Sequence, residues 1–267
     1  MSDLSENMTL SDFLNANYLS LNMKYDVDIV FVVDVSGSMK AFFCVFEKLI
    51  LGFYNLLTEK LNRKNKEIDI LRVKFVFFND FIECMRDKTN PLIVTDFYNL
   101  SDKNSSQMDN LIEGISSINS LGGGDIPEDG LEALACAMKS DWCKRKLDHK
   151  RRHIIVVFTD APTHKLGFEK MSRGYPESMP ENFDELTQML GDKLNRAVSM
   201  DHIAKRLLLF IPKVEYLPAD DGWKKIADEA YSLENCDSCY LDLNNRHTSS
   251  TDSEKINIIL DRIVSMI

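Results

Sequence analysis

The sequence predicts an α/β fold: a doubly wound, mostly parallel six-stranded sheet with one short antiparallel edge strand and helices on both faces. From about residue 25 to the end, apolar runs of strand length alternate with longer amphipathic stretches. This alternation is typical of parallel sheets built from strand–helix–strand units. No internal boundary interrupts it, so residues 25–267 are expected to form one domain. Residues 1–24 have mixed polarity and are expected to form an N-terminal arm or short helix.

The first half of the predicted domain runs strand, helix, strand. Val27–Val33, apolar except for Asp28, is typical of a buried strand, and Met39–Leu61 places apolar residues at helical spacing. Ile70–Phe78 is the second strand. Asn79-Asp80 is then expected to turn the chain into a hairpin, whose antiparallel partner is Phe81–Met85.

The second half continues the alternation. Met108–Ile118 is expected to be a helix. Another helix is expected to begin at Pro127, which suits a first turn, and to continue through Lys139. The remaining expected elements are strands at Ile154–Phe158 and Leu207–Ile211, helices at Phe183–Val198, Trp223–Tyr231 and Glu254–Ile267, and an extended segment at Cys239–Leu243.

Composition argues against several classes of protein. With 44% hydrophobic and 28% charged residues, the 267-residue chain is typical of a folded domain. Since 42 acidic and 32 basic residues leave a net charge of −10, nucleic acid and anionic membranes are poor candidate partners. The first residues lack the features of a secretory signal, and no apolar run approaches the roughly 18 residues of a membrane span. The six scattered cysteines are expected to be reduced, so the sequence predicts a cytoplasmic protein.

Three polar clusters are expected at one edge of the sheet. Asp34, Ser36 and Ser38 follow the first strand, Gly122–Glu128 precedes a helix, and Thr159-Asp160 ends a later strand. In parallel α/β sheets, ligands bind outside the carboxyl ends of the strands. The clusters offer carboxylates and hydroxyls, which suit Mg²⁺, Mn²⁺ or Ca²⁺ better than Zn²⁺.

Each cluster alone has a simpler interpretation. Asp-x-Ser-Gly-Ser after a strand is often a helix N-cap with a permissive glycine, and a glycine triplet before Asp-x-Pro-Glu is often a plain loop. A Thr-Asp pair at a strand end is commoner still. The order and strand context of all three clusters together favour a metal site.

The segment DVSGSM resembles the Asp-x-Ser-x-Ser of the metal-ion-dependent adhesion site in von Willebrand factor A-type (vWA) domains. GGGDIPEDGLEAL and VVFTDAPTH are similar to the corresponding loops of integrin β I-like domains and of intracellular vWA proteins, including those beside α-kinases. The resemblance covers the chain from about Tyr25 to its end. It implies that Ser36, Ser38 and Glu128 bind a cation directly, and that Asp34 and Asp160 act through ordered water.

The sequence departs from the integrin pattern at two neighbouring sites. Ala41-Phe42 stands where integrin β chains carry two acidic residues, so the adjacent calcium site is expected to be missing. Asp80, Asp125 and Glu128 match part of a further integrin-type site. Gly123 replaces its asparagine, which makes these three residues a weaker candidate for a second cation.

The resemblance implies a binding module in which Mg²⁺ captures an Asp or Glu of a partner protein. The alternative from a different class is a metal-dependent hydrolase, for which His164 is a candidate general base. No phosphate-binding loop of the G-x-x-x-x-G-K-[ST] type is present. A minor third alternative is a nucleic-acid-associated vWA protein that uses the basic run Lys144–His153, although such a run is more often a solvated connection.

Overall fold

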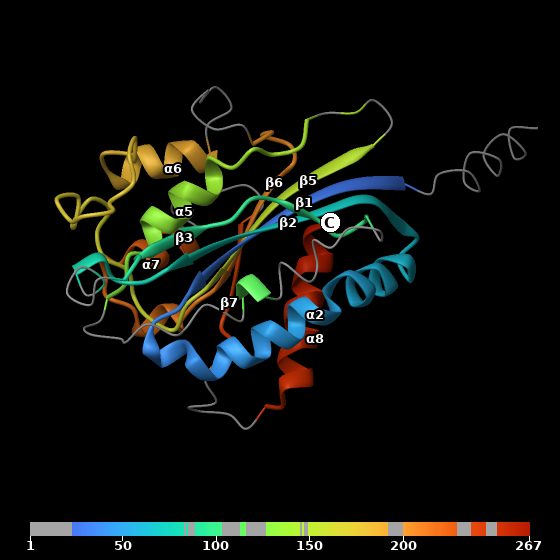
Figure 1. Ribbon diagram of the computed structural model, residues 1–267, viewed down its shortest axis with the longest axis horizontal. Helices are drawn as coiled ribbons and strands as arrows, with labels where there is room; N and C mark the ends of the chain where they lie inside the picture. Colours follow the sequence, from blue (N-terminus) through green and yellow to red (C-terminus); the bar gives the residue numbers. More distant parts are fainter. Residues whose placement is uncertain are drawn as a thin grey trace, which may run out of the picture.

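Helices cover both faces of a central sheet (Figure 1). The computed structural model describes residues 23–82, 84, 89–102, 113–115, 127–144, 146, 149–191, 200–228, 236–243 and 250–267. Seven strands lie within these ranges: β1 (Met23–Asp34), β2 (Lys66–Phe78), β3 (Leu92–Val94), β4 (Tyr98–Asn99), β5 (Lys150–Phe158), β6 (Lys205–Phe210) and β7 (Cys236–Cys239). The predicted α/β class is confirmed.

The sheet is mostly parallel. Its strand order is β3-β2-β1-β5-β6-β7, and the two-residue β4 also pairs with β2. Five strands, β2, β1, β5, β6 and β7, are mutually parallel, whereas β3 and β4 run antiparallel to β2. The predicted antiparallel edge is therefore present, divided into two short pieces.

The helices form two layers. One layer contains α2 (Lys40–Asn62) and α8 (Asp252–Met266), and the other contains α5 (Gly130–Met138), α6 (Phe183–Gly191) and α7 (Gly222–Ala227). Two short 3-10 turns complete the described elements: η1 (Gly37–Met39) and η2 (Val214–Tyr216). Successive β1 residues face alternate layers, with Phe31 toward α2 and Val32 toward α5. Burial on both faces explains why Ile29–Val33 of β1 is a continuous apolar run.

Helix α2 packs on the sheet through an apolar face. Phe46 and Phe53 are seven residues apart, and both contact the Phe31 ring edge-on, at centroid distances of 5.7 and 5.4 Å. The segment Gly37–Asn62 is also long and apolar enough to cross a membrane by length and composition, a test that the core helix of a soluble protein passes as well. In this fold, most of its apolar side chains pack against the sheet and α8, whereas Leu51 is exposed.

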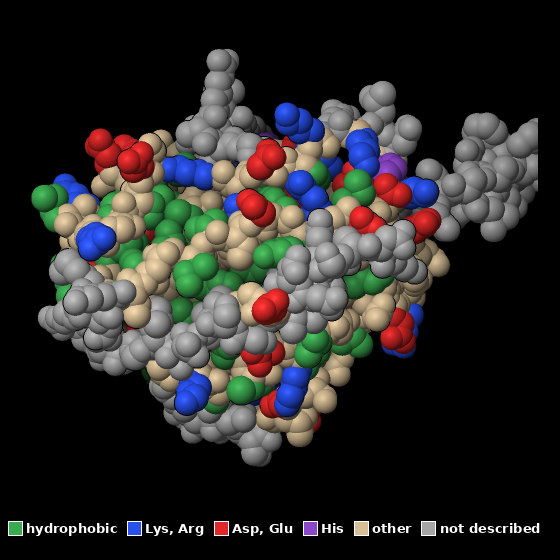
Figure 2. Space-filling model, in the orientation of Figure 1, with side chains coloured by type: hydrophobic (Ala, Val, Ile, Leu, Met, Phe, Trp, Pro, Cys, Tyr) green, Lys and Arg blue, Asp and Glu red, His purple; other side chains and the backbone are tan. Residues whose placement is uncertain are grey.

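Charged side chains of both signs cover the surface. On the face shown in Figure 2, Lys and Arg side chains are scattered among Asp and Glu, with hydrophobic side chains between them. The described residues of this face therefore carry no continuous stripe of one sign.

Three predicted elements are wrong in place or type. Phe81 and Ile82 are helical, and the antiparallel partner of β2 is Leu92–Val94. The Phe81 backbone N–H donates to the Asp129 carboxylate over 2.8 Å, so it is not available to a strand ladder. Helix α5 begins at Gly130 rather than Pro127, because Glu128 is extended and bridges to Thr163. The last strand is Cys236–Cys239, not Cys239–Leu243.

Parts of other predictions lie outside the described residues. Of the expected helix Met108–Ile118, residues 113–115 are described and are helical. Helix α6 is described to Gly191, and the rest of its predicted span lies outside the described residues. Helix α7 ends at Ala227; residue 228 is not helical, and residues 229–231 of the predicted span are not described. The predicted arm at residues 1–24 is described only from residue 23, where β1 begins.

The strand order also fixes where a ligand would bind. Without β4, it is the doubly wound order in which chain connections reverse direction beside the first strand. The reversal lies between β1 and β5, whose last paired residues are Val33 and Phe158. Ligands of such sheets bind outside the carboxyl ends of the strands at this switch point. Asp34, which ends β1, and Thr159, which follows β5, lie there.

Candidate metal centre

Asp34 and Thr159 are joined across the switch point. The Thr159 hydroxyl donates to Asp34 Oδ2 over 2.7 Å, and both residues are buried. The pairing of β1 with β5 brings these two side chains together, because Asp34 ends β1 and Thr159 follows β5 at the same edge of the sheet. The threonine thereby fixes the rotamer of the carboxylate.

The loop after β1 folds back on Asp34. Asp34 Oδ1 accepts a hydrogen bond from the Ser36 backbone N–H over 2.8 Å, the local turn that aspartate favours. This turn places the Ser36 and Ser38 hydroxyl oxygens 3.1 Å apart. Ser38 Oγ donates to Asp160 Oδ1 over 2.7 Å. Two hydroxyls and two carboxylates from the loops after β1 and β5 are thus connected in one network.

Burial makes this network electrostatically unusual. Burial of Asp34 raises the pKa of its carboxyl to about 6, against the hydrogen bonds from Ser36 and Thr159, which lower it. The negative charge of Asp160 raises the Asp34 pKa further. A cation beside the two carboxylates would remove both penalties. Ser36 is 1% exposed, whereas Ser38 is exposed, so the network leads from the core to the surface.

Glu128 reaches the same edge from the segment before α5. Its backbone N–H donates to Pro162 O over 3.1 Å, and its carbonyl accepts from the His164 N–H over 2.9 Å. The buried Glu128 is therefore held beside the loop that carries Asp160. The structure brings Asp34, Ser36, Ser38 and Asp160 into hydrogen-bonding contact and places Glu128 on an adjoining backbone; their action as ligands stays a prediction.

The donor set fits a hard divalent cation. Ligand oxygens at right angles around an ion at about 2.1 Å are separated by about 3.0 Å. The Ser36 and Ser38 hydroxyls, 3.1 Å apart, have that separation. Serine hydroxyls and carboxylates are also the oxygen donors that Mg²⁺, Mn²⁺ and Ca²⁺ prefer.

The second predicted cation set is only partly described. Asp125 and Gly123 lie outside the described residues. Asp80 is buried, and its Oδ2 lies 3.4 Å from His164 Nε2. The structure also groups Asp80 with His164 and Glu169. Glu169 was not predicted, because no strand end or motif marks it in the sequence.

Further buried acids surround this group. Burial raises the pKa of Asp129 to about 9, although the Phe81 N–H bonded to its carboxylate opposes the shift. Burial also raises the pKa of Glu132, whose Oε1 accepts hydrogen bonds from the Gly167 N–H and the Tyr175 hydroxyl. The end of β2, the start of α5 and the loop after β5 therefore enclose several carboxyl groups.

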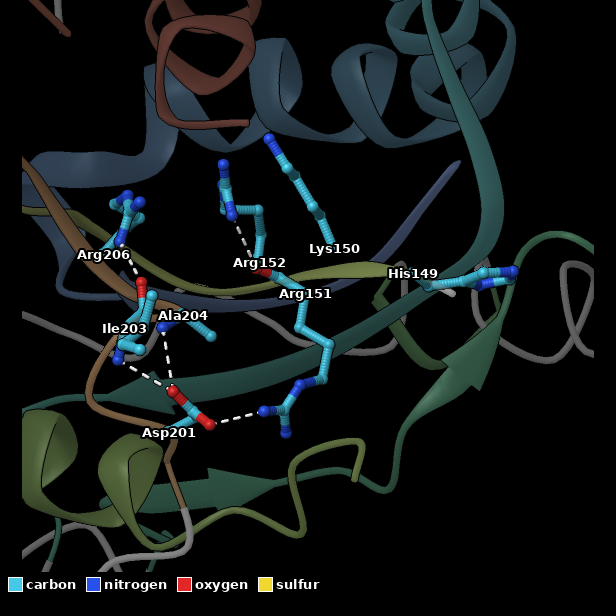
Figure 3. A pocket seen from close by; sticks show the side chains of 8 residues that line it. All are labelled: His149, Lys150, Arg151, Arg152, Asp201, Ile203, Ala204 and Arg206. Carbon is cyan, nitrogen blue, oxygen red and sulfur yellow. Dashed lines mark hydrogen bonds and ion pairs between the residues drawn. The ribbon is translucent and has the colours of Figure 1, made fainter. Parts of the chain in front are cut away.

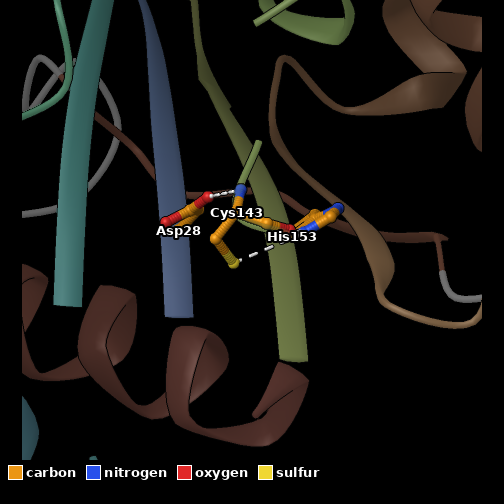
Figure 4. A group of neighbouring side chains, drawn as sticks. All are labelled: Asp28, Cys143 and His153. Carbon is orange, nitrogen blue, oxygen red and sulfur yellow. Dashed lines mark hydrogen bonds between the residues drawn. The ribbon is translucent and has the colours of Figure 1, made fainter. Parts of the chain in front are cut away.

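A different cluster lies at the opposite, amino-terminal end of the sheet (Figure 4). It contains Asp28, Cys143 and His153, whose polar atoms are close enough to hold a metal ion. Arg72 Nε and a terminal nitrogen donate to the two Asp28 oxygens over 2.8 and 2.6 Å. Burial raises the pKa of the Cys143 thiol to about 12, so it is not a thiolate at neutral pH. A guanidinium already neutralises this carboxylate, and the cluster is a packed ion pair.

A basic pocket lies at the same end (Figure 3). Figure 3 shows Lys150 and Arg152 pointing toward the side of α2 and α8, and Arg151 pointing the other way, to Asp201. Arg206 donates to the backbone carbonyls of Ile203 and Lys205. Part of the run Lys144–His153 is therefore committed to local contacts, as expected for a structural connection.

Comparison with known proteins gives a likeness of fold. No family model matches the chain, and no curated protein matches its sequence. Similar solved structures include SpaC, a pilus adhesin from Lactobacillus rhamnosus GG, at 11% identity and a TM-score of 0.47. They also include proximal thread matrix protein 1 of the mussel byssus, described with a zinc-occupied MIDAS motif, at 11% identity and a TM-score of 0.44.

These structures are longer than the chain. The likeness covers 90% of the chain and 30% of SpaC, and 91% of the chain and 48% of the byssus protein. At such identities and TM-scores the likeness decides neither the fold nor the ligands of the chain, which follow from its own strand order and residues. By its own strand order the chain has a doubly wound α/β fold, with polar loops after β1 and β5 that meet at the switch point of the sheet.

Proposed function

We propose that this chain is a divalent-cation-dependent binding module that captures an Asp or Glu side chain of a partner protein. The cation site consists of Ser36, Ser38 and Glu128 as direct ligands, with Asp34 and Asp160 acting through ordered water. The observation that carries the proposal is the 3.1 Å separation of the two serine hydroxyls at the switch point of the sheet.

Several hydrogen bonds hold the proposed ligands in place. Thr159 and the Ser36 backbone N–H orient Asp34, so that the serine loop is held before any ion enters. Asp160 accepts from Ser38 and connects the loop after β5 to that of β1. Such fixed outer contacts raise the affinity of metal sites by limiting the motion of their ligands.

A bound Mg²⁺ would supply an electrophilic coordination position for a carboxylate oxygen. The count of donors supports this position, since three protein oxygens and two ordered waters leave one of about six places. Exposed Ser38 marks the side from which a partner could approach. A charge-assisted contact of this kind is strong and directional.

Charge and composition support the choice of a protein partner. The net charge of −10 disfavours nucleic acid and anionic lipid, and the described face in Figure 2 has no basic stripe. We propose that the protein acts in the cytoplasm, where its six cysteines would stay reduced.

A peptide selection tests the proposal. The full chain is immobilised, a random peptide display library is bound in Mg²⁺, and bound peptides are eluted with EDTA. We expect the eluted peptides to share an Asp or Glu whose replacement by Asn or Gln abolishes binding. The Ser36→Ala/Ser38→Ala variant should capture none of them, whereas Ser253→Ala, which changes an exposed serine in α8, should behave as the wild type.

The same material separates binding from hydrolysis. Peptides without a shared acidic residue, or capture that survives EDTA, would refute metal-bridged binding. Metal-dependent cleavage of a simple ester or phosphate ester that disappears in the serine double variant would instead favour the hydrolase.

A further inference from the structure

A second group of polar side chains lies buried between the end of β2, the start of α5 and the loop after β5. Asp80, His164 and Glu169 each place one potential ligand atom within 4.8 Å of the others. We call these three residues the buried acid–imidazole cluster. They come from two loops at the carboxyl edge of the sheet, and a fourth group, Asp129, caps α5 next to them.

The cluster contains carboxylate oxygens that lack hydrogen bonds. Glu169 is 4% exposed, and neither of its oxygens has a hydrogen bond of ordinary geometry among the described residues. The same holds for Asp129 Oδ1, in a residue that is 1% exposed. Burial and the charge of Asp80 raise the pKa of Glu169, while the Ile82 N–H and the Asp129 carboxyl lie close enough to lower it. A buried carboxylate without a hydrogen bond or counter-charge is strongly destabilising.

The imidazole of His164 is directed into the same group. His164 Nε2 has no hydrogen-bond partner among the described residues and lies 3.4 Å from Asp80 Oδ2. The ring is 12% exposed, and Phe168 stacks on it at a centroid distance of 4.7 Å and an interplanar angle of 9°. Stacking fixes the plane of the ring and shields it from water. One imidazolium would balance at most one of the surrounding carboxylates.

We propose that Asp80, His164 and Glu169 bind a divalent transition-metal ion of the Zn²⁺ class, with Asp129 as a fourth or outer ligand. One imidazole nitrogen with two or three carboxylate oxygens is a donor set for Zn²⁺, Mn²⁺ or Fe²⁺, whereas Mg²⁺ and Ca²⁺ prefer oxygen alone. The ion gives the Glu169 oxygens and His164 Nε2 the partner that the described residues do not provide. The site shares Asp80 with the second cation set expected from the sequence, and it includes none of the proposed direct ligands Ser36, Ser38 and Glu128.

A structural role follows from the elements that the ion would join. His164 and Glu169 lie in the loop that begins at Asp160, and Asp80 lies at the end of β2. A metal ion between them would cross-link this loop to the sheet across a separation of more than 80 residues in the chain. It would thereby stabilise the loop that carries Asp160, without contacting the serine hydroxyls.

Zinc binding by the full chain tests the site. The protein is stripped with chelator, and its uptake of Zn²⁺ is measured by calorimetry and by metal analysis after desalting. We expect wild type and the Ser36→Ala/Ser38→Ala variant to bind one tight equivalent each. Glu169→Gln and His164→Gln should bind it at least about tenfold more weakly. Glu177→Gln, an exposed change in the same loop, should leave it unaltered.

Two further measurements keep the test independent of variant folding. Zn²⁺ should raise the melting temperature of the wild type and not that of Glu169→Gln, which in EDTA should melt no lower than the wild type because a neutral amide replaces a buried carboxylate. Anomalous scattering from crystals grown with Zn²⁺ should place the ion beside His164 Nε2. Zinc bound only at the serines, zinc retained by both cluster variants, or no tight zinc would each overturn the proposal. Failure of the serine site would leave this zinc equivalent in place.

Discussion

Ser38 and Asp160 are 122 positions apart in the chain, yet the Ser38 hydroxyl donates to Asp160 Oδ1 over 2.7 Å. This contact exists only when β1 and β5 pair, because each residue lies in the loop directly after one of these strands. The cation site is therefore a product of the sheet, and neither loop can form it alone.

The Thr159–Asp34 contact predicts a loss of metal affinity in Thr159→Val. Valine keeps the branched shape but cannot donate to Asp34 Oδ2, so the carboxylate loses its orientation. We expect Mg²⁺ affinity, measured by calorimetry, to fall by about 10-fold or more. Thr187→Val in α6, which removes a hydroxyl bonded to Asp184 O, is the matched control and should bind Mg²⁺ normally. Equal affinity in the two variants would show that Asp34 needs no such support.

Helix α5 approaches α7 so closely that Gly130 has no room for a side chain. A Cβ atom at this position would lie 2.3 Å from Trp223 Cζ2, inside the buried indole. Gly130→Ala should therefore lower the free energy of unfolding by about 1–3 kcal/mol, as overpacked cores do. Urea denaturation measures this change. Gly114→Ala, where a Cβ meets nothing within 4 Å, should be neutral or slightly stabilising.

The core strands could be predicted from sequence because their own residues are apolar, and that local pattern indicates burial. Ile29–Val33 and Ile154–Phe158 are apolar throughout and lie inside β1 and β5. The local pattern wrongly predicted a hairpin at Asn79-Asp80. The group that captures the Phe81 N–H is Asp129, 48 residues later, and no local pattern reveals such a partner.

The same distinction holds for the site. Asp34, Ser36 and Ser38 form a contiguous motif, so their association could be predicted. Glu169 was missed because its neighbours Asp80 and Asp129 come from other loops, and only the folded chain brings their carboxyl groups together.

The Arg72–Asp28 pair predicts a large effect on stability. Asp28 is fully buried and accepts two hydrogen bonds from the Arg72 guanidinium. Arg72→Leu leaves this carboxylate without a counter-charge and should reduce the free energy of unfolding by about 3–5 kcal/mol. Adding Asp28→Asn should restore part of the loss. Arg63→Leu removes a pair with Glu59 that is exposed on α2, and should change stability by less than about 1 kcal/mol.

His153 predicts a loss of stability in acid. Its Nδ1 accepts from the Asp201 N–H, and its Nε2 donates to Cys143 O, each over 3.1 Å, which defines a neutral ring. Burial lowers the pKa of His153 from 6.5 to about 4. Between these values the unfolded chain binds a proton that the folded chain does not, so the free energy of unfolding falls as pH falls from about 6.5 to about 4. The full contribution is roughly 3 kcal/mol.

The variant His153→Gln isolates this contribution, since other buried acids titrate in the same range. Urea unfolding from pH 7 to pH 4 should show the wild type losing stability relative to the variant as pH decreases. Parallel curves would mean that His153 is protonated in the folded protein as readily as in the unfolded chain.

The parallel strands also separate charge along the molecule. Arg151 and Arg152 begin β5 and Asp160 follows its end, a rise of about 25 Å along the strand. The buried acids at the amino-terminal end, such as Asp28, are paired with basic groups, whereas several acids lie side by side at the carboxyl edge, so charge is separated along the strand axis. An acidic partner would meet a repulsive field at that edge until a divalent ion reverses its sign locally. Loading the ion would therefore change the rate of encounter as well as the final bond. Because the field is screened over about 8 Å at physiological ionic strength, this gain in rate would diminish as salt is added.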